Sequence, residues 1–391
     1  MKMHNLDSLN PLKFTELIKN RETEIAKAAD DACVADFNAN LLAQSLHPQK
    51  QILRISHIKE AKDAKIYTLT AEKCAYFTAG QYISVSVNIN GKTYSRPYSI
   101  LSSPKEALKG FYQVAVKRVE GGVVSNYILD NMNVGDALEV SDPTGNFTYE
   151  PLRDAEHIIA IAGGSGITPF ASLAKAIAEG SEDCALTILY GSRKEEDILL
   201  RSELDEICKN SDKVKVVYVL SDENKEGFEH GFISYDLLQK YAPKEKYSVF
   251  LCGPQAMISF VDKEISKLNL EKKYIRHEVH GEVADPSAFE GYPENVPETV
   301  KMTVYVKSEK IEFITSSNNT VLRILEDNGI NPPSRCRGGE CGFCHSKLLS
   351  GKVFMPKELD RRRQADEKFG FIHPCCSYPL SDLVIKVSES H

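Results

Sequence analysis

The chain has 391 residues, of which 42% are hydrophobic and 26% charged, and its formal net charge is −7. This length suggests roughly two to four domains, and the acidic balance argues against general nucleic-acid binding, which needs a basic face. No run approaches the ~20 apolar residues of a membrane span, and the N-terminus lacks the apolar core of a secretory signal. We therefore expect a cytoplasmic protein without membrane insertion.

Residues 1–50 have a helical pattern. Asn10 can cap a helix that begins at Pro11, and apolar residues follow at helical spacing. We expect a helical N-terminal extension in this segment.

Residues 51–152 have the pattern of short β-strands. Polar and apolar residues alternate over residues 82–87, and Asn90-Gly91 follows, a pair that favours a tight hairpin turn. Several short strands at this spacing predict an antiparallel β-barrel.

Residues 153–281 alternate between strand and helix patterns. Four apolar runs are typical of buried parallel strands, at residues 158–162, 185–190, 214–220 and 248–251. This alternation predicts an α/β domain with a parallel sheet. Three prolines then mark residues 282–299 as a linker, and a small domain follows over residues 300–391.

Five of the ten cysteines lie in this last domain, and their spacing is informative. Cys336-x4-Cys341-x2-Cys344, with Cys375 and Cys376 further on, has the spacing of a plant-type [2Fe–2S] ferredoxin. Three glycines among the first three cysteines would let the backbone fold closely around a cluster. A zinc ribbon would instead have two separate C-x2-C pairs. The spacing leaves either Cys375 or Cys376 as the fourth ligand.

Two motifs in the predicted barrel suit a flavin. Tyr98 would provide a flat aromatic wall, and Arg96 a fixed cation for a phosphate. Gly121 and Gly122 would let backbone amides approach that phosphate, and Ser125 would add a hydroxyl at a helix start. Each motif alone is weak evidence, because such residues are often structural.

A glycine-rich loop follows the first predicted parallel strand. Gly164, Gly166 and Thr168 lie in it, and a helix opened by Pro169 at its first position would place amide donors around a pyrophosphate. Pro169 stands where the G-x-G-x-x-G fingerprint has its last glycine, so this is not the usual Rossmann loop.

In this order the motifs resemble the ferredoxin–NADP reductase family of flavoproteins with an added plant-type ferredoxin domain, as in the reductase components of phenylacetyl-CoA epoxidase and phthalate dioxygenase. The resemblance covers residues 51–391 and includes Cys252-Gly253-Pro254. It implies a multidomain fold, in which the helical N-terminal extension (1–50) is followed by an antiparallel β-barrel flavin domain (51–152), an α/β parallel-sheet nucleotide domain (153–281), the linker (282–299) and an α+β β-grasp ferredoxin domain (300–391).

The resemblance also implies roles for single residues. Ser99 would lie near flavin N5 and Cys252 beside the nicotinamide C4, which makes these two the catalytic candidates. The last ligand cysteine of such ferredoxins lies three residues before Tyr-Pro, which selects Cys375 and leaves Cys376 as a neighbour. The implied metal ligands are Cys336, Cys341, Cys344 and Cys375. The candidates for binding the organic cofactors are Arg96, Pro97, Tyr98, Ser99, Lys117, Gly121, Gly122, Val123, Ser125, Gly164, Gly166, Thr168, Asp222, Cys252, Gly253, Pro254 and His280.

The choice of cofactors follows from finer features. Residues 96–104 are more similar to the FAD-binding members than to the phthalate dioxygenase reductase branch, which binds FMN. Asp222 would accept hydrogen bonds from a free ribose and repel a 2′-phosphate, which favours NADH, although Arg193 and Lys194 could attract the phosphate of NADPH. His280 stands where the family often has an aromatic residue over the flavin, and it is either that contact or an ordinary loop histidine.

NADH delivers two electrons as hydride and a cluster takes one at a time, so the flavin must divide the pair. We expect an NADH-dependent reductase that passes single electrons to a separate acceptor protein, an oxygenase or another metalloenzyme. The alternatives are a self-contained reductase of a small acceptor, such as a quinone, free flavin or oxygen, and a relay or redox-sensing subunit of a larger complex. The N-terminal extension would serve either as a packing element or as a docking surface for the electron acceptor.

Overall fold

The computed structural model describes residues 23, 50–279, 281–283 and 285–387. The expected N-terminal extension therefore lies outside the described residues, apart from Thr23 and Lys50. The described residues from Lys50 onward form one compact unit.

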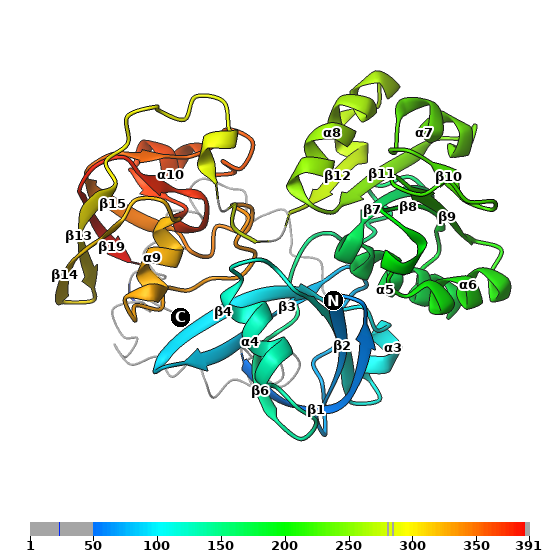
Figure 1. Ribbon diagram of the computed structural model, residues 1–391, viewed down its shortest axis with the longest axis horizontal. Helices are drawn as coiled ribbons and strands as arrows, with labels where there is room; N and C mark the ends of the chain where they lie inside the picture. Colours follow the sequence, from blue (N-terminus) through cyan, green and yellow to red (C-terminus); the bar gives the residue numbers. More distant parts are fainter. Residues whose placement is uncertain (1–22, 24–49, 280, 284, 388–391) are drawn as a thin grey trace. The chain divides into compact units, whose positions relative to one another are not determined.

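The first sheet of this unit is a six-stranded antiparallel barrel, drawn in blue to cyan in Figure 1. Its strands, in spatial order, are β4 (Lys92–Ser99), β3 (Tyr82–Ile89), β6 (Ala137–Ser141), β1 (Lys50–Ala61), β2 (Ala64–Thr70) and β5 (Phe111–Lys117). An antiparallel bridge between Ile100 and Val114 joins the end of β4 to β5, so the two edges of the sheet meet. Two helices accompany the barrel, α3 (Pro104–Ala107) and α4 (Val123–Asn131). The predicted β-barrel is confirmed.

The predicted hairpin turn joins β3 and β4. Asn90 and Gly91 have φ of 52° and 80°, and Ile89 pairs with Lys92 on either side of them. Two consecutive residues in the left-handed region form the turn that matches the twist of a tight hairpin. This register continues along both strands and places Ser99 opposite Tyr82.

The second sheet is six-stranded and parallel, with helices on both faces (Figure 1). Its strands, in spatial order, are β10 (Glu229–His230), β9 (Val214–Leu220), β8 (Ala185–Ser192), β7 (His157–Gly163), β11 (Tyr247–Cys252) and β12 (Ile275–Glu278). Helices α5 (Thr168–Ala178) and α6 (Arg201–Asn210) cover one face, and α7 (Tyr235–Tyr241) and α8 (Gln255–Ile265) cover the other. The chain leaves β7 toward β8 and returns to β11 on its other side, and such a switch point is where open α/β sheets bind ligands.

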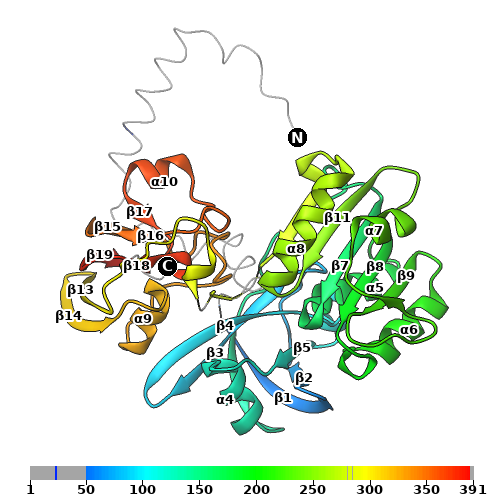
Figure 2. The same ribbon diagram turned by 45° about the horizontal axis from the view of Figure 1, so that its top comes forward.

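The third sheet, drawn in yellow to red in Figure 2, has five strands. Their spatial order is β14 (Glu309–Ser316), β13 (Thr299–Val306), β19 (Leu383–Val387), β15 (Ser346–Ser350) and β17 (Phe371–Ile372). The central strands β13 and β19 are parallel, and helix α9 (Val321–Asp327) packs its apolar face against them. The remaining elements are α10 (Gln364–Lys368) and a small sheet of β16 (Val353–Phe354) and β18 (Tyr378–Pro379).

The described residues of the predicted linker pack against this last domain. The hydroxyl of Tyr378 donates to the carbonyl of Val283 at 2.6 Å, and the Tyr292 ring meets Phe354 edge-on at 5.1 Å. Phe289 packs against a buried cluster of five residues, which are Leu322, Cys344, Leu359, Cys375 and Cys376. The linker is therefore fixed at several points along its length.

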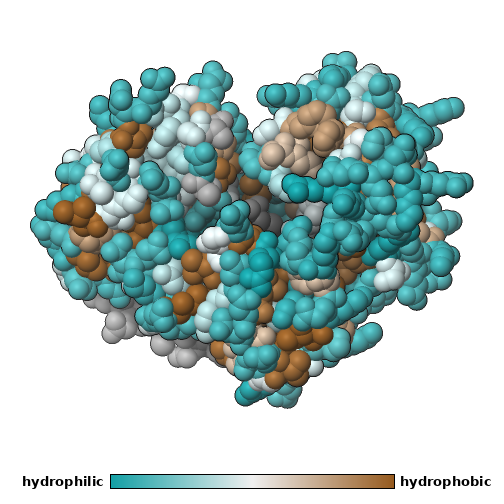
Figure 3. Space-filling model, in the orientation of Figure 1, coloured by the Kyte–Doolittle hydropathy of each residue, from teal (hydrophilic) through white to brown (hydrophobic). Residues whose placement is uncertain are grey.

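The face of the molecule in Figure 3 is largely hydrophilic, and its hydrophobic groups form small separate patches. No helix among the described residues is long and apolar enough to cross a membrane.

Candidate active site

Side chains from the ends of three strands meet beside the switch point. Ser99 ends β4, Cys252 ends β11 and Glu278 ends β12. The parallel register of β11 and β12 places Cys252 directly beside Glu278. The Ser99 hydroxyl donates to Glu278 Oε2 at 3.4 Å, and the Cys252 thiol lies 4.0 Å from the same oxygen.

The three residues Ser99, Cys252 and Glu278 are almost completely buried from solvent. Ser99 is 6% exposed, Cys252 5% and Glu278 4%. Burial, and after it the charge of Glu278, raises the pKa of the Cys252 thiol well above its ordinary value. This shift favours the protonated thiol, whereas the nucleophilic form of cysteine is the thiolate.

Glu278 is the functional residue that the sequence reading did not select. In the segment 278–281 the family resemblance indicated His280, which lies outside the described residues. The available signal was weak, because Glu278 ends the short and mostly polar segment Ile275–Glu278, which has no apolar strand pattern. Only the pairing of β11 with β12 shows that the two side chains are neighbours.

A cavity of about 540 Å³ opens in front of this group. It brings together the residues of both flavin motifs, part of the glycine-rich loop and the segment that begins at Cys252. The predicted residues that line it are Arg96, Pro97, Tyr98, Ser99, Lys117, Gly121, Gly122, Val123, Ser125, Gly166, Thr168, Cys252, Gly253 and Pro254.

The cavity wall formed by α4 fits a phosphate. Gly122 occupies the N-cap position and gives α4 no side-chain cap, so the first N–H groups of the helix lack such a partner. Gly121 has φ of 67°, with no atom within 4 Å of the place where a Cβ would stand. Open amides at a helix start favour an anion. Together with Tyr98 as a flat wall, these residues fit the phosphate and ring of FAD.

Arg96 also lines the cavity, but it is already engaged. Its Nη1 donates to Glu326 Oε2 at 3.1 Å and to the backbone oxygen of Ser95 at 2.6 Å. Burial, and then the like charge of Arg337, lowers the pKa of Arg96, yet an arginine remains charged in a protein. Nε and Nη2 of Arg96 make no hydrogen bond to any described residue. Arg96 can therefore serve a phosphate and Glu326 at once.

A second cavity of about 880 Å³ lies at the carboxyl ends of the parallel strands. It is lined by Gly164 and Asp222, and also by Lys117 and Pro254. Lys117 and Pro254 line the first cavity as well. The glycine-rich loop forms a 3₁₀ turn over Gly164–Ile167, and α5 begins at Thr168, one residue earlier than predicted.

Gly166 lets the loop pack closely against β11. A Cβ at Gly166 would lie 2.2 Å from the carbonyl oxygen of Cys252, which no side chain could tolerate. The glycine therefore brings the start of α5 next to the end of β11, where the two cavities adjoin.

Asp222 stands at the rim of the second cavity. It is exposed and accepts a hydrogen bond from the Ser221 hydroxyl at 2.6 Å. Arg193 and Lys194, also exposed, line the same cavity. The carboxylate is thus accessible to a ribose, with two cations in the same rim.

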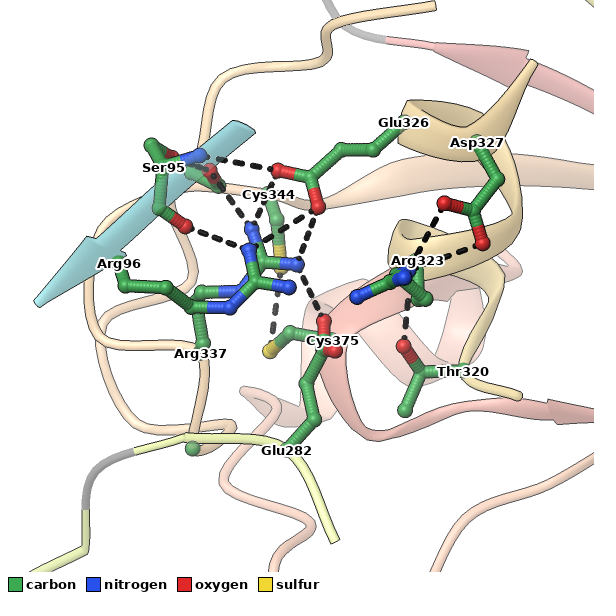
Figure 4. Close-up of polar contacts among 12 residues, drawn as sticks. Ser95, Arg96, Glu282, Thr320, Arg323, Glu326, Asp327, Arg337, Cys344 and Cys375 are labelled. Carbon is green, nitrogen blue, oxygen red and sulfur yellow. Dashed lines mark hydrogen bonds and ion pairs between the residues drawn. The ribbon is translucent and has the colours of Figure 1, made fainter. Parts of the chain in front are cut away.

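The cysteines that are predicted to bind the cluster lie close together in the last domain. The thiols of Cys344 and Cys375 lie 3.4 Å apart, as Figure 4 shows. Backbone N–H groups of Gly338 and Cys341 donate to the sulfur of Cys336, each at 3.4 Å. Hydrogen bonding to the Cys341 thiol, and next to the Cys375 thiol, lowers the pKa of Cys336. These four sulfurs fit the four-thiolate ligand set of a [2Fe–2S] cluster.

Cys376 is a neighbour of this set with other contacts. Its thiol points to two backbone carbonyls, those of Leu359 at 3.9 Å and His373 at 3.5 Å. In the described part of the chain, no three His, Cys, Asp or Glu side chains are arranged to hold a single metal ion. A two-iron cluster divides its four thiolates between two metals, so it does not need such a convergent group.

The loop that carries the first three cysteines has unusual backbone conformations. Gly339 and Gly342 have φ of 85° and 66°, as their proposed freedom requires, and Arg337 has φ of 55°. For a residue with a side chain this conformation costs about 1–2 kcal/mol. Arg337 is fully buried, and its Nε has no hydrogen-bond partner among the described residues. An unpartnered N–H beside Cys336 fits a loop that surrounds an anionic cluster.

Comparisons with known proteins define the class. Residues 53–149 match the oxidoreductase FAD-binding domain, residues 160–263 the oxidoreductase NAD-binding domain, and residues 304–380 the 2Fe-2S iron-sulfur cluster binding domain. The protein is thus an oxidoreductase with flavin, nicotinamide and iron–sulfur domains in one chain. It belongs to the ferredoxin–NADP reductase-type flavoproteins that carry a plant-type ferredoxin domain.

Similar proteins cover different shares of the chain. A subunit of the 1,2-phenylacetyl-CoA epoxidase of Escherichia coli K12 is 29% identical over 342 residues, which is 83% of this chain and 94% of that protein. The structure of phthalate dioxygenase reductase covers 87% of this chain and 98% of its own, with a TM-score of 0.63 and 27% identity. NADH-cytochrome b5 reductase 1 of Dictyostelium discoideum is 38% identical over 183 residues, so the match spans 46% of this chain and 62% of that reductase.

Proposed function

We propose that this chain is an NADH-dependent reductase that passes electrons through FAD and a [2Fe–2S] cluster to a separate acceptor protein of the oxygenase type. One observation carries the proposal. The cavity in front of Ser99, Cys252 and Glu278 is also lined by Thr320 and Arg323, which belong to the ferredoxin domain. The place for hydride transfer and the domain for single-electron transfer therefore share one cavity.

Bound FAD would supply the conversion of a hydride pair into single electrons. The residues of the chain would position and protect that chemistry. Tyr98 would support the flavin ring, while Ser99, with its hydroxyl held by Glu278, would fix the edge where hydride arrives. The protonated Cys252 would pack beside the nicotinamide without reacting, and the burial of all three residues would exclude water.

The acceptor class rests on relatives that match nearly the full chain. They include the glycine betaine monooxygenase reductase subunit of Chromohalobacter salexigens, 26% identical over 84% of this chain and 93% of its own. One of these relatives is named as the reductase subunit of a monooxygenase, and the other as a subunit of an epoxidase. A separate oxygenase component is therefore the acceptor that we propose.

We further propose NADH as the reductant, because the carboxylate of Asp222 would repel a 2′-phosphate. The nine cysteines in the described residues are all free, which supports a reducing compartment such as the cytoplasm. The domain limits proposed are those read from the sequence, with the flavin domain over 51–152, the nucleotide domain over 153–281 and the ferredoxin domain over 300–391.

An anaerobic titration of the purified holoprotein with NADH tests the proposal. Flavin absorbance should bleach, and the electron paramagnetic resonance signal of a reduced [2Fe–2S] cluster should appear in the same sample. If the flavin bleaches while the cluster stays oxidised, the ferredoxin domain is not the exit for electrons. A self-contained reductase of a small acceptor would then replace the proposal.

A further inference from the structure

One carboxylate in the ferredoxin domain accepts hydrogen bonds from two arginines that belong to different domains (Figure 4). Glu326, on α9, accepts two hydrogen bonds from Arg337, one on each oxygen, both at 2.8 Å. Its Oε2 also accepts from Arg96 Nη1 at 3.1 Å. Arg96 lies on β4 in the flavin motif, whereas Arg337 directly follows the cluster ligand Cys336. Glu326 therefore joins the flavin site to the cluster loop.

A fourth charge completes the arrangement. Glu282, just after the nucleotide domain, accepts a hydrogen bond from Arg337 Nη2 at 2.6 Å. Two carboxylates thus face two guanidinium groups, and the four charges balance.

The group is buried to an extent that is unusual for charged residues. The side chain of Glu326 is 4% exposed, that of Arg337 0% and that of Arg96 18%. A buried ion pair is a weak source of stability, because desolvation offsets most of the attraction, whereas removal of one partner leaves an uncompensated charge. The documented benefit of such pairs is that they fix one arrangement over its alternatives.

Other contacts between the barrel and the ferredoxin domain surround this group. The hydroxyls of Ser95 and Ser334 lie 3.1 Å apart, and Tyr94 donates to Asp327 Oδ1 at 3.1 Å. On the cluster side, Arg335 Nη2 donates to Asp142 Oδ1 at 3.0 Å. These groups are more exposed than Glu326. Glu326 is the contact that reaches both the flavin motif and the cluster loop.

We propose that Glu326 is a positioning residue for electron transfer, which holds the cluster loop through Arg337 against the flavin site through Arg96. The inference rests on the proposed function. The redox step would belong to the bound groups: reduced FAD would give up one electron, with its proton passing to water, and one ferric iron of the cluster would take that electron and become ferrous. Glu326 takes no part in the bonds that change. It sets the separation of the two centres.

The test compares Glu326→Gln, which keeps the shape and removes the charge, with Glu326→Asp, which keeps the charge on a shorter side chain. Glu309→Gln is the matched control, because Glu309 is an exposed carboxylate of the same domain. Rapid-mixing measurements on each holoprotein would follow flavin bleaching by NADH and then cluster reduction. A redox titration followed by electron paramagnetic resonance would give the midpoint potential of the cluster.

For Glu326→Gln, flavin bleaching should stay within about twofold of wild type, because the hydride site is separate from the substitution. Cluster reduction should slow by about tenfold or more, since a small misplacement has a large effect on rate. The cluster potential should shift in the positive direction, because Arg337 loses one compensating charge. Glu326→Asp should keep the wild-type potential and recover part of the rate, and Glu309→Gln should match wild type in all three measurements.

A Glu326→Gln protein with both cofactors bound and an unchanged rate of cluster reduction would overturn the inference. So would equal slowing of both steps, which indicates a general effect on the fold. If Glu326→Gln does not fold, a wild-type rate in Glu326→Asp overturns it in the same way. Failure of wild-type protein to reduce its own cluster is a different result, because it removes the proposed function itself.

Discussion

Ser99, Cys252 and Glu278 stand at the ends of hydrogen-bonded strands, whereas Cys336, Cys341 and the residues between them stand in a loop without a regular strand. In the first region, backbone pairing places the functional side chains, and the register of β11 and β12 alone brings Cys252 to Glu278. In the cluster loop, left-handed backbone conformations and ion pairs from other elements have that task.

This difference teaches where each region is vulnerable. A strand-end residue can change its side chain while the backbone stays in place, because ladder hydrogen bonds hold the strand. A substitution at a loop residue with a restricted backbone conformation changes the backbone itself, because no ladder hydrogen bonds hold the loop. We therefore expect substitutions in the loop to remove the cofactor, and substitutions at the strand ends to change rate or specificity alone.

The largest expected effect is that of Gly339→Ala on the cluster. Gly339 has φ of 85°, and an added Cβ would lie 2.2 Å from the carbonyl oxygen of Leu359. We expect protein that binds FAD but lacks the iron–sulfur absorbance and has no bound iron or sulfide. Gly329→Ala is the control, because it shares the positive φ but has open space around the new methyl group. A normal iron content in Gly339→Ala would show that the loop adapts more than this comparison allows.

The second effect is that of Glu278→Gln on hydride transfer. The substitution should leave FAD bound and the fold intact, because the strand ladder remains. Loss of the charge that orders the Ser99 hydroxyl should slow flavin reduction by NADH, on the order of 10²-fold, as expected when reacting groups are misplaced. Stopped-flow absorbance of the flavin under anaerobic conditions measures this rate. A variant that loses its FAD would place Glu278 with the loop residues in this comparison.

The smallest effect is that of Asp222→Ser, at an exposed position after a strand. Removing the carboxylate should raise kcat/KM for NADPH by roughly tenfold, or about 1.4 kcal/mol, because a surface charge acts weakly through water. The rate with NADH should fall slightly. Steady-state ferricyanide reduction with each coenzyme would measure both. An unchanged preference would mean that Arg193 and Lys194 set the specificity in this rim.

The sequence was sufficient for the features that depend on local pattern. The barrel, the parallel sheet and the Asn90-Gly91 hairpin followed from alternation and turn chemistry, and the plant-type spacing of cysteines identified the last domain. The glycine-rich loop was read correctly as a turn before a helix, but its 3₁₀ geometry and the earlier helix start were not predicted.

The features that the sequence did not predict all depend on contacts between distant segments of the chain. Glu278 lies 179 residues from Ser99, and Glu326 lies 230 residues from Arg96. Glu278 opens the family segment at residues 278–281, but that segment indicated a role for His280 and not for the acidic residue. Glu326 belongs to no local motif, and an acidic residue on a short helix usually faces water. Only the tertiary structure shows that both are buried among partners. The predicted phosphate contact of Arg96 was likewise incomplete, because Arg96 also binds the ferredoxin domain.

The packing of residues 282–299 has a consequence for protein engineering. These residues are tied to the ferredoxin domain through Tyr378 and Phe354, and Glu282 reaches Arg337 in the cluster loop. In a chimera that joins a foreign ferredoxin domain after residue 299, residues 282–299 would remain, although their contacts fit the original ferredoxin domain. We propose that an exchange of ferredoxin domains should be made near Gly281, so that the transplanted domain keeps its own preceding segment.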